Sequence, residues 1–178
     1  LAPASRGLTI TAAMVDGVVG TSDKEYPMGS AGVALDSVAL FNPLAAPGDD
    51  IDAEKYTFDS YNAHPAPDGS YHYHTTSPGP LEVLATLDQT SNTVPGTATV
   101  EIYGIMCDGT VVMGCTEADG SAPSAAGLDA QNGHVHDIKG VDGGVLFAGR
   151  YHTHMCEAKL GGHKFTPEIQ YYSTCTMK

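Results

Sequence analysis

Basic residues and long apolar runs are both scarce in this chain of 178 residues. Lysine and arginine together number 8 against 21 aspartates and glutamates, so the formal net charge is −13. Nucleic acids and anionic membranes attract proteins through basic surfaces, and this balance argues against both as partners. No stretch approaches the roughly 20 apolar residues that a membrane-spanning helix needs. We therefore expect no binding of nucleic acid and no membrane insertion.

Helical periodicity is lacking as well, because 21 glycines and 11 prolines interrupt most windows of the sequence. Short runs of strand character are frequent, and in the clearest of them Ala98, Val100 and Ile102 alternate onto one face. We expect an all-β fold with little helix, either a sandwich or a small barrel. The expected strands span residues 8–15, 33–41, 81–87, 97–105, 110–113, 145–147 and 168–173.

One histidine-rich motif occurs twice in the chain. The first copy consists of Asp59, Asn62, His64, Gly69, Tyr71, His72 and His74. The second copy consists of Asp129, Asn132, His134, Gly149, Tyr151, His152 and His154, with an additional His136. The copies are 70 positions apart at their aspartates and 80 at their tyrosines, so the second holds ten extra residues. Composition alone does not cluster histidine in this way, and the pattern indicates an internal duplication.

The duplication extends upstream, where residues 32–40 align with residues 104–112. Each segment is an apolar run, a two-residue turn and a second apolar run, and the Asp108-Gly109 turn is a strong hairpin signal. We therefore expect a domain over residues 31–178 that contains two related halves, about 31–80 and 102–156. The two halves should superpose, with their histidine strands packed near each other or near a pseudo-twofold axis.

The histidines in each copy have the spacing of metal ligands on a strand. Residues i and i+2 of a strand share a face, so His72 and His74 project together, as do His152 and His154. A zinc or copper site is predicted in each half, with ligands from His64, His72, His74, His134, His136, His152 and His154. Asp59 and Asp129 are expected to orient ligating rings, and Asn62 and Asn132 to hold the turns. A buried hydrogen-bond network without metal is the alternative.

The four cysteines, Cys107, Cys115, Cys156 and Cys175, favour disulfides over thiolate metal ligation, because no C-x-x-C spacing occurs. A tight turn at residues 108–109 would separate the first two, so we expect Cys107 and Cys115 each to pair with Cys156 or Cys175. An acidic run of Asp49, Asp50, Asp52 and Glu54 is a weaker candidate for calcium, since it lacks EF-hand spacing.

The Tyr71-His72-Tyr73-His74 string resembles the signature of the YHYH-domain family, and the resemblance spans residues 32 to 154. It departs from the family at Ala63, where the family has glycine, and at Thr153 in the second copy. Where the family often has cysteine before asparagine, this chain has Tyr61 and Gln131. The resemblance implies that the histidines at 64, 72, 74, 134, 152 and 154 are the motif residues. It also implies an exported protein, but no particular activity.

Localisation outside the cell also fits the first residues, Leu-Ala-Pro-Ala-Ser, which look like the mature end left after removal of a signal peptide. The alternating segment Leu8 to Met14 is either a first strand in its own sheet or a strand donated to a neighbouring subunit. We place residues 1–30 in this N-terminal segment, which the assembly would use.

Catalytic motifs such as G-x-S-x-G and H-E-x-x-H do not occur in the sequence. The function that we favour is therefore that of a secreted, non-catalytic structural subunit that self-assembles into a homo-oligomer or filament. Its two histidine-rich sites would bind metal or act as structural networks. The alternatives are a periplasmic or extracellular metal-binding carrier, and a zinc or copper metalloenzyme in which an open coordination position activates water.

Overall fold

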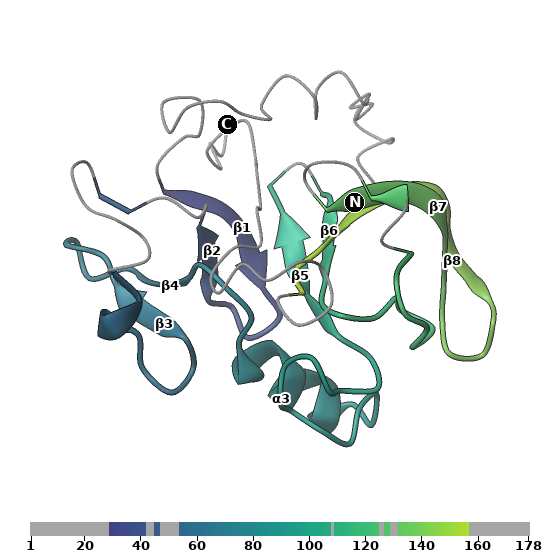
Figure 1. Cartoon of the computed structure of the whole chain (residues 1–178), viewed down its shortest axis with the longest axis horizontal. Coiled ribbons are helices and arrows are strands. Elements are labelled where there is room, and N and C mark those ends of the chain that lie inside the picture. The colour runs from purple at the N-terminus through teal and green to yellow at the C-terminus, as the bar shows by residue number, and fades with distance from the viewer. Residues whose placement is uncertain are drawn as a thin grey trace.

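The structure is a computed structural model, and it describes residues 29–41, 45–46, 54–107, 109–124, 127–128 and 132–156. In these residues, eight strands form one mixed sheet in the order β3-β4-β2-β1-β5-β6-β8-β7 (Figure 1). The strands are β1 (Ser30–Ala34), β2 (Ala39–Phe41), β3 (Ala63–Pro65), β4 (Tyr71–Tyr73), β5 (Ile102–Met106), β6 (Val111–Met113), β7 (Gly133–Lys139) and β8 (Val145–His154). This confirms a mostly β fold built from two related halves. The described strands share one sheet that is not closed into a barrel, where we had expected a sandwich or small barrel.

The sheet order is symmetric about its centre. Strands β1, β2, β3 and β4 of the first half take the same places as β5, β6, β7 and β8 of the second half, counted outward from the centre. β1 and β5 pair antiparallel at the centre, where Val33 lies opposite Ile105, its counterpart in the other copy. A pseudo-twofold axis therefore passes through this pair. Each half then adds an antiparallel hairpin partner, a parallel strand and an antiparallel outer strand. The duplication predicted from the sequence thus appears in the topology of the sheet.

The two central hairpins are closed by the same hydrogen bonds. The Ala34 amide donates to the Val38 carbonyl and the Met106 amide to the Thr110 carbonyl, both at 2.8 Å. Gly32 and Gly104 occupy equivalent positions where the halves meet. A Cβ atom added at Gly32 would lie 2.6 Å from the Ile105 carbonyl oxygen, and one at Gly104 would clash with the Val33 carbonyl oxygen. Glycine therefore permits the close approach of β1 and β5.

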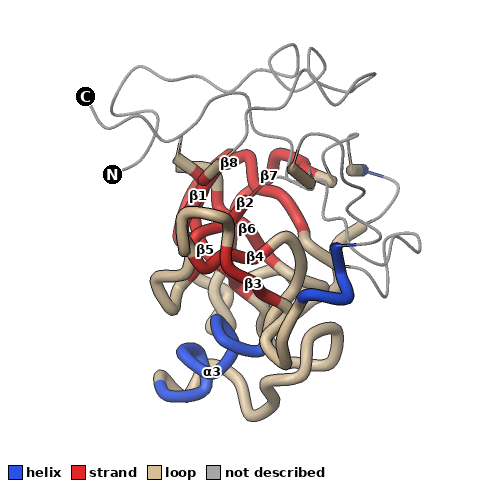
Figure 2. Tube along the Cα trace, turned by 90° about the vertical axis from the view of Figure 1, so that its left-hand side faces the viewer, coloured by secondary structure: helices blue, strands red, loops and turns tan. Residues whose placement is uncertain are grey.

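The expected strand at residues 81–87 is wrong, because this segment belongs to helix α3 (Pro78–Thr86). The Ser77 side chain caps the helix by accepting a hydrogen bond from the Gly79 amide, and proline in the first turn suits a helix start. Leu81 and Leu84 are buried in the main core with Tyr73 and Tyr103, and α3 lies beyond one end of the sheet (Figure 2). Burial of this apolar side overrides the strand-like composition. In the described residues, no helix is both long and apolar enough to cross a membrane.

The expected strand at 97–105 forms only from Ile102 onward. Ala98 and Val100 are buried, as the alternation predicted, but the buried Glu101 carboxylate accepts hydrogen bonds from the amides of Ala98 and Cys115. These side-chain bonds satisfy the local backbone in place of a strand ladder. A short 3-10 turn, η2 (Lys55–Thr57), precedes β3. The expected strands at 8–15 and 168–173, and the N-terminal segment 1–30 apart from its last two residues, lie outside the described residues.

β7 and β8 continue past the sheet as a two-stranded ribbon, which extends the predicted strand at 145–147 (Figure 1). In the first copy the Ala66 amide donates to the Ser70 carbonyl and the turn closes directly after β3. In the second copy the equivalent bond runs from the Gly140 amide to the Gly144 carbonyl, and the same kind of turn closes farther out. The ten inserted residues therefore lengthen this hairpin.

Candidate metal centres

The first histidine cluster is built by the pairing of β3 with β4. His64 lies directly opposite His72 in the antiparallel register, and His74 projects on the same side as His72. The His72 Nε2 atom is 3.0 Å from His64 Nε2 and 2.9 Å from His74 Nε2. All three residues are buried, with 6% or less of their surface exposed. Their ring nitrogens lie close enough together to hold one metal ion.

Hydrogen bonds fix which nitrogen of these rings carries the proton. His72 Nδ1 is 2.9 Å from the Ser70 carbonyl oxygen, which can only accept, so Nδ1 is the protonated nitrogen of a neutral ring. His64 Nδ1 is 2.7 Å from Thr57 Oγ1, and that hydroxyl already donates its hydrogen to the Glu54 carbonyl. When the Thr57 hydroxyl donates to the Glu54 carbonyl, His64 donates to that hydroxyl through Nδ1 as well. Both rings present an unprotonated Nε2 to the centre of the cluster.

The two Nε2 lone pairs consequently face each other at 3.0 Å, and neither neutral ring can donate to the other. Burial lowers the pKa of His64 and of His72, which disfavours an imidazolium that would supply a bridging proton. Two nitrogens bound at about 2.0–2.1 Å to one ion lie roughly 2.9–3.4 Å apart for angles between 90° and tetrahedral. The spacing of the cluster therefore suits a shared cation.

The residues around this cluster hold the loop that presents His64. Asn62 has a positive φ of 58° and its side chain donates to the Thr76 carbonyl, so it holds the turn, as expected. Asp59 accepts hydrogen bonds from the Tyr61 amide and the Tyr71 hydroxyl, and so it braces the loop rather than a ligating ring. The expected role of Asp59 in orienting an imidazole is wrong, because Thr57 and a backbone carbonyl perform that role.

The second cluster repeats this frame and adds to it. His134 lies opposite His152 in the β7–β8 ladder, and His134 Nε2 is 2.8 Å from His152 Nε2 and 3.2 Å from His154 Nε2. His152 and His154 donate through Nδ1 to the carbonyls of Arg150 and Gly114, so their Nε2 atoms are also unprotonated when the rings are neutral. His136, two residues after His134 on the same side of β7 but more exposed, contributes a fourth ring.

Glu117 places its carboxylate among these four rings. Oε1 lies 3.1 to 3.3 Å from the Nε2 atoms of His134, His136 and His154, and Oε2 lies 3.0 Å from that of His152. Burial raises the pKa of Glu117, but hydrogen bonds and positive charge from His152 and His154 in their imidazolium form outweigh it and hold the pKa well below its usual range. When these rings are neutral their Nε2 atoms cannot donate to the carboxylate, and a bound cation would supply the positive charge in their place. Burial, together with the neighbouring His152, lowers the pKa of His134 to about 4. An ionised carboxylate and neutral imidazoles are a ligand set for a divalent transition metal.

The structure brings all seven predicted histidines into the two clusters, but it places the clusters at opposite flanks of the sheet (Figure 1). Strands β2, β1, β5 and β6 separate β4 from β8, so the expectation that the histidine strands pack together or near the pseudo-twofold is wrong. Asn132 has the same positive φ, 53°, as its counterpart Asn62. Asp129 lies outside the described residues, as do Asp49, Asp50 and Asp52 of the calcium candidate. Glu54 from that run lies 3.8 Å from His64 Nε2.

Glu117 was not predicted from the sequence. The position that aligns with it in the first copy is not a glutamate. Glu117 follows Cys115 by two residues, in a loop whose sequence shows neither strand nor helix periodicity. The Cys115–Cys156 disulfide ties this loop to the end of β8, and its Cα atoms are 4.7 Å apart. This pairing agrees with the expected one. Cys107 is disulfide-bonded as well, and Cys175 lies outside the described residues.

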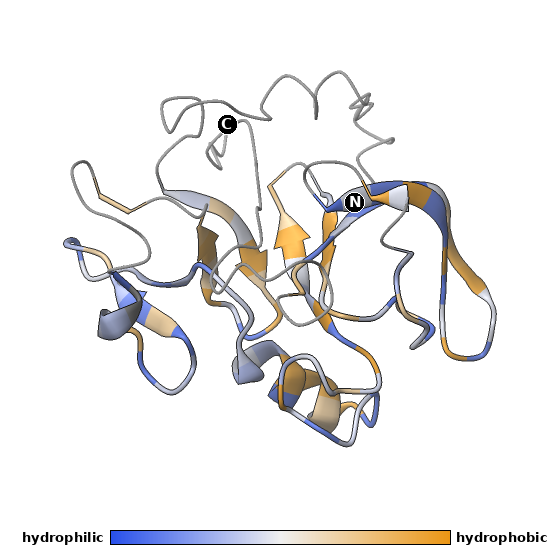
Figure 3. Cartoon of the chain, viewed as in Figure 1, coloured by the Kyte–Doolittle hydropathy of each residue, from blue (hydrophilic) through white to orange (hydrophobic). Residues whose placement is uncertain are grey.

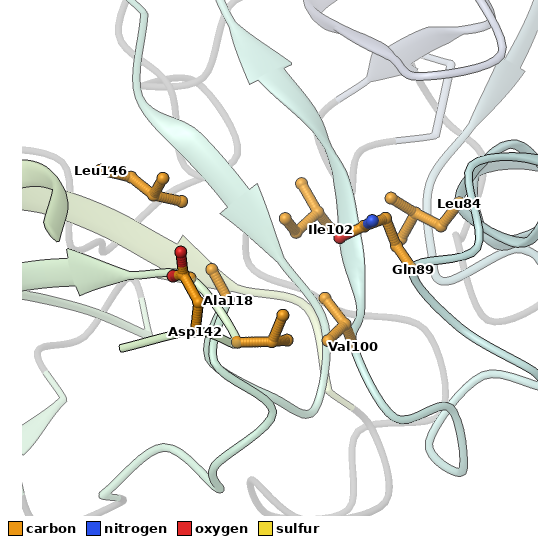
Figure 4. Close-up of a pocket in the computed structure, with 9 residues that line it drawn as sticks. Leu84, Gln89, Val100, Ile102, Ala118, Asp142 and Leu146 are labelled. Carbon is orange, nitrogen blue, oxygen red and sulfur yellow. The ribbon is translucent and has the colours of Figure 1, made fainter. Parts of the chain in front are cut away.

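An apolar pocket of about 250 Å³ lies between α3 and the turn of the β7–β8 ribbon (Figure 4). Leu84 and Val100 line one side of it, and Ala118, Asp142 and Leu146 line the other. Neither histidine cluster contributes a lining residue, so the pocket is distinct from the metal-ligating groups.

A model of the YHYH protein family matches residues 14–124, which is more than half of the chain, and the chain therefore belongs to this family. The match contains the first histidine cluster and Glu117, and it ends before His134. No curated protein and no solved structure matches the chain significantly.

Proposed function

We propose that this protein binds two transition-metal ions, one in each half, and that each ion fastens an outer strand to the sheet. The observation that carries the proposal is the facing of unprotonated Nε2 atoms across 3.0 Å in the first cluster. A metal-free network would need a donor between these acceptors. Metal-ligating histidines characteristically donate their other ring nitrogen to a backbone carbonyl, as His72, His152 and His154 do.

The test is elemental analysis of purified full-length protein after incubation with Zn²⁺ or Cu²⁺ and removal of the excess. We expect two equivalents per chain, one equivalent in His72→Ala, one in His152→Ala and none in the double variant. His163→Ala removes the single histidine outside the two motif copies, and this control should keep both equivalents. No bound metal in the wild type, together with an unchanged melting temperature, would establish the hydrogen-bond network instead.

We further propose that the protein works outside the cytoplasm. Stable disulfides form in oxidising compartments, and the Cys115–Cys156 bond supports export for this reason. Fractionation of the source cells should find the chain in the extracellular or periplasmic fraction with its cysteines oxidised. Recovery from the cytoplasm with free thiols would contradict the proposal.

A second candidate function is self-assembly through the β7–β8 ribbon. Figure 3 shows stretches of hydrophobic residues, in orange, along this ribbon. Five of its apolar residues are 45% to 64% exposed: Val135, Val141, Val145, Leu146 and Phe147. The first copy closes its turn without such a ribbon, so the sheet does not require these residues. Exposed apolar patches mark interaction surfaces, and among the described strands β7 is the last of the sheet, with no neighbour on its outer side.

A second copy of this chain is the partner that the charges favour. Residues 133–150 contain two acidic and two basic side chains and are formally neutral, whereas the chain carries −13. Two copies therefore meet with least repulsion at their ribbons. Sedimentation over a range of concentrations should show association, weakened in a Val145→Ser, Phe147→Ser variant. A Leu87→Ser, Val94→Ser control changes equally exposed residues away from the ribbon and should associate normally. A wild-type monomer at every concentration would contradict self-assembly.

A further inference from the structure

The two clusters share a three-histidine frame but differ in the groups that surround it. The nearest carboxylate oxygen to the first cluster in the described part of the chain, from Glu54, is 3.8 Å from His64 Nε2. His64, His72 and His74 occupy the same register positions as His134, His152 and His154. Among the described residues, only the second cluster adds a fourth imidazole and a carboxylate within 3.3 Å of the ring nitrogens. The additional ring, His136, lies at the base of the inserted ribbon.

Aromatic rings cover two sides of the first cluster, and the Glu54 carboxylate lies beside His64. Phe41 stacks on His72 with ring centres 3.9 Å apart, and Phe58 contacts the edge of His64 at 4.8 Å and stacks over His74 at 6.0 Å. Apolar rings offer an incoming water or chelator no polar group to replace a histidine ligand. An ion here can leave only after the side chains that cover it move apart.

The second cluster has a ligand at the surface. The side chain of His136 is 41% exposed, whereas those of His152 and His154 are fully buried. His136 Nε2 lies 3.3 Å from Glu117 Oε1, and its Nδ1 donates to the carbonyl of the adjacent Asp137. A solvent-exposed ring can swing away and be replaced by water while the other ligands hold the ion. Glu117 meanwhile partly neutralises the charge of a divalent ion.

We infer that the two sites exchange their ions at different rates: the second site is the exchanging one, with His136 as its entry ligand, and the first site retains its ion behind Phe41 and Phe58. This inference rests on the metal-binding function proposed above. It assigns the inserted segment of the second copy a role in metal exchange. The first site then serves as a permanent fastener of β3, and the second responds to the metal available outside the protein.

The test is release of Zn²⁺ from fully loaded full-length protein into an excess of a chromophoric chelator. We expect two phases of equal amplitude, one ion each, separated in rate by at least about tenfold. His152→Ala should lose the fast phase, and His72→Ala should lose the slow phase. These two variants assign the phases independently of any rate change.

Two further variants test the causes of the difference. His136→Ala should alter the rate of the fast phase alone, whereas Val94→Ala, at an exposed valine outside both clusters and the ribbon, should alter neither phase. Phe58→Ala should accelerate the slow phase about tenfold and leave the fast phase unchanged. A single phase that releases both ions, or a slow phase that disappears in His152→Ala, overturns the inference but not the proposed function. Failure to load any Zn²⁺ or Cu²⁺ overturns the proposed function itself.

Discussion

Thr57 joins the first cluster to the loop before it through a single hydroxyl. It donates to the Glu54 carbonyl and accepts from His64 Nδ1. Thr57→Val preserves the shape but removes both bonds, and we expect the affinity of the first site for Zn²⁺ to fall about 10–100-fold. The measurement is a competition titration in the His152→Ala background, where only the first site binds.

Two control variants test whether the loss of affinity comes from the Thr57 hydroxyl. Thr57→Ser retains the hydroxyl and should restore the affinity. Thr86→Val removes a comparable hydroxyl bond, from Thr86 Oγ1 to the Val83 carbonyl, in α3. An equal loss of affinity in Thr86→Val would show that the effect of Thr57 is general destabilisation.

Tyr73 makes the fold sensitive to alkaline pH. Burial, and then the 2.6 Å hydrogen bond to the Asp36 carboxylate, raise the pKa of Tyr73 well above its usual value. The folded state therefore holds this proton more tightly than the unfolded state, whose tyrosine pKa is about 10. The stabilisation is complete below that pH and is lost as the pH rises above it. Tyr73→Phe should show a shallower loss of unfolding free energy above pH ~10 in denaturant titrations. Equal slopes for both proteins would contradict this assignment.

At the scale of elements, local sequence patterns predicted the hairpins and histidine strands that the two copies share. The hairpins around Ser37 and Gly109 and the shared face of His72 and His74 followed from turn chemistry and strand alternation. The parallel pairing of β2 with β4 and of β6 with β8 did not, because it joins segments that no local spacing connects. The pairing of His64 with His72 was not predicted either, because no strand was expected at residues 63–65. The helix α3 was missed because its apolar residues are also strand formers, and its capping by Ser77 was not weighed.

In the candidate sites, too, locally spaced residues could be predicted from the sequence and residues brought in from distant segments could not. Histidines at i and i+2 on a strand could be placed on one face from the sequence alone. Glu117 could not, because a disulfide brings its loop to the cluster, and a single glutamate carries no spacing signal. The separation of the two clusters depends on the strand order at the centre of the sheet.

The Cys115–Cys156 disulfide links the Glu117 loop to the segment that follows His154. Its effect should therefore be local as well as global. A Cys115→Ser, Cys156→Ser variant should weaken Zn²⁺ binding at the second site and leave the first site unchanged, as measured by competition titration. The unfolding free energy should also fall by about 4 kcal/mol from the lost loop constraint. Equal weakening of both sites would show that the bond acts only through overall stability.

For the whole molecule, metal binding at both flanks should stabilise the sheet. An ion present at 100 times its dissociation constant adds about 2.7 kcal/mol to the unfolding free energy for each site. The melting temperature should therefore rise with Zn²⁺ in the wild type, and by a smaller amount in His72→Ala and in His152→Ala. A chelator should reverse each rise. An identical rise in both variants and the wild type would place the binding elsewhere on the chain.

Acidification should remove this stabilisation. The metal-free protein should already lose unfolding free energy as the pH falls. The pKa of His134 is lowered to about 4 by burial and by His152, so the folded state binds this proton more weakly than the unfolded state, where the imidazole pKa is about 6.5. Stability should therefore fall as the pH drops from about 6.5 to about 4. Metal-loaded protein should fall more steeply over the same range, because protons compete with the ion for each Nε2 atom. Denaturant titrations across this range, with and without Zn²⁺, measure both slopes, and parallel curves would show that these imidazoles do not bind the metal.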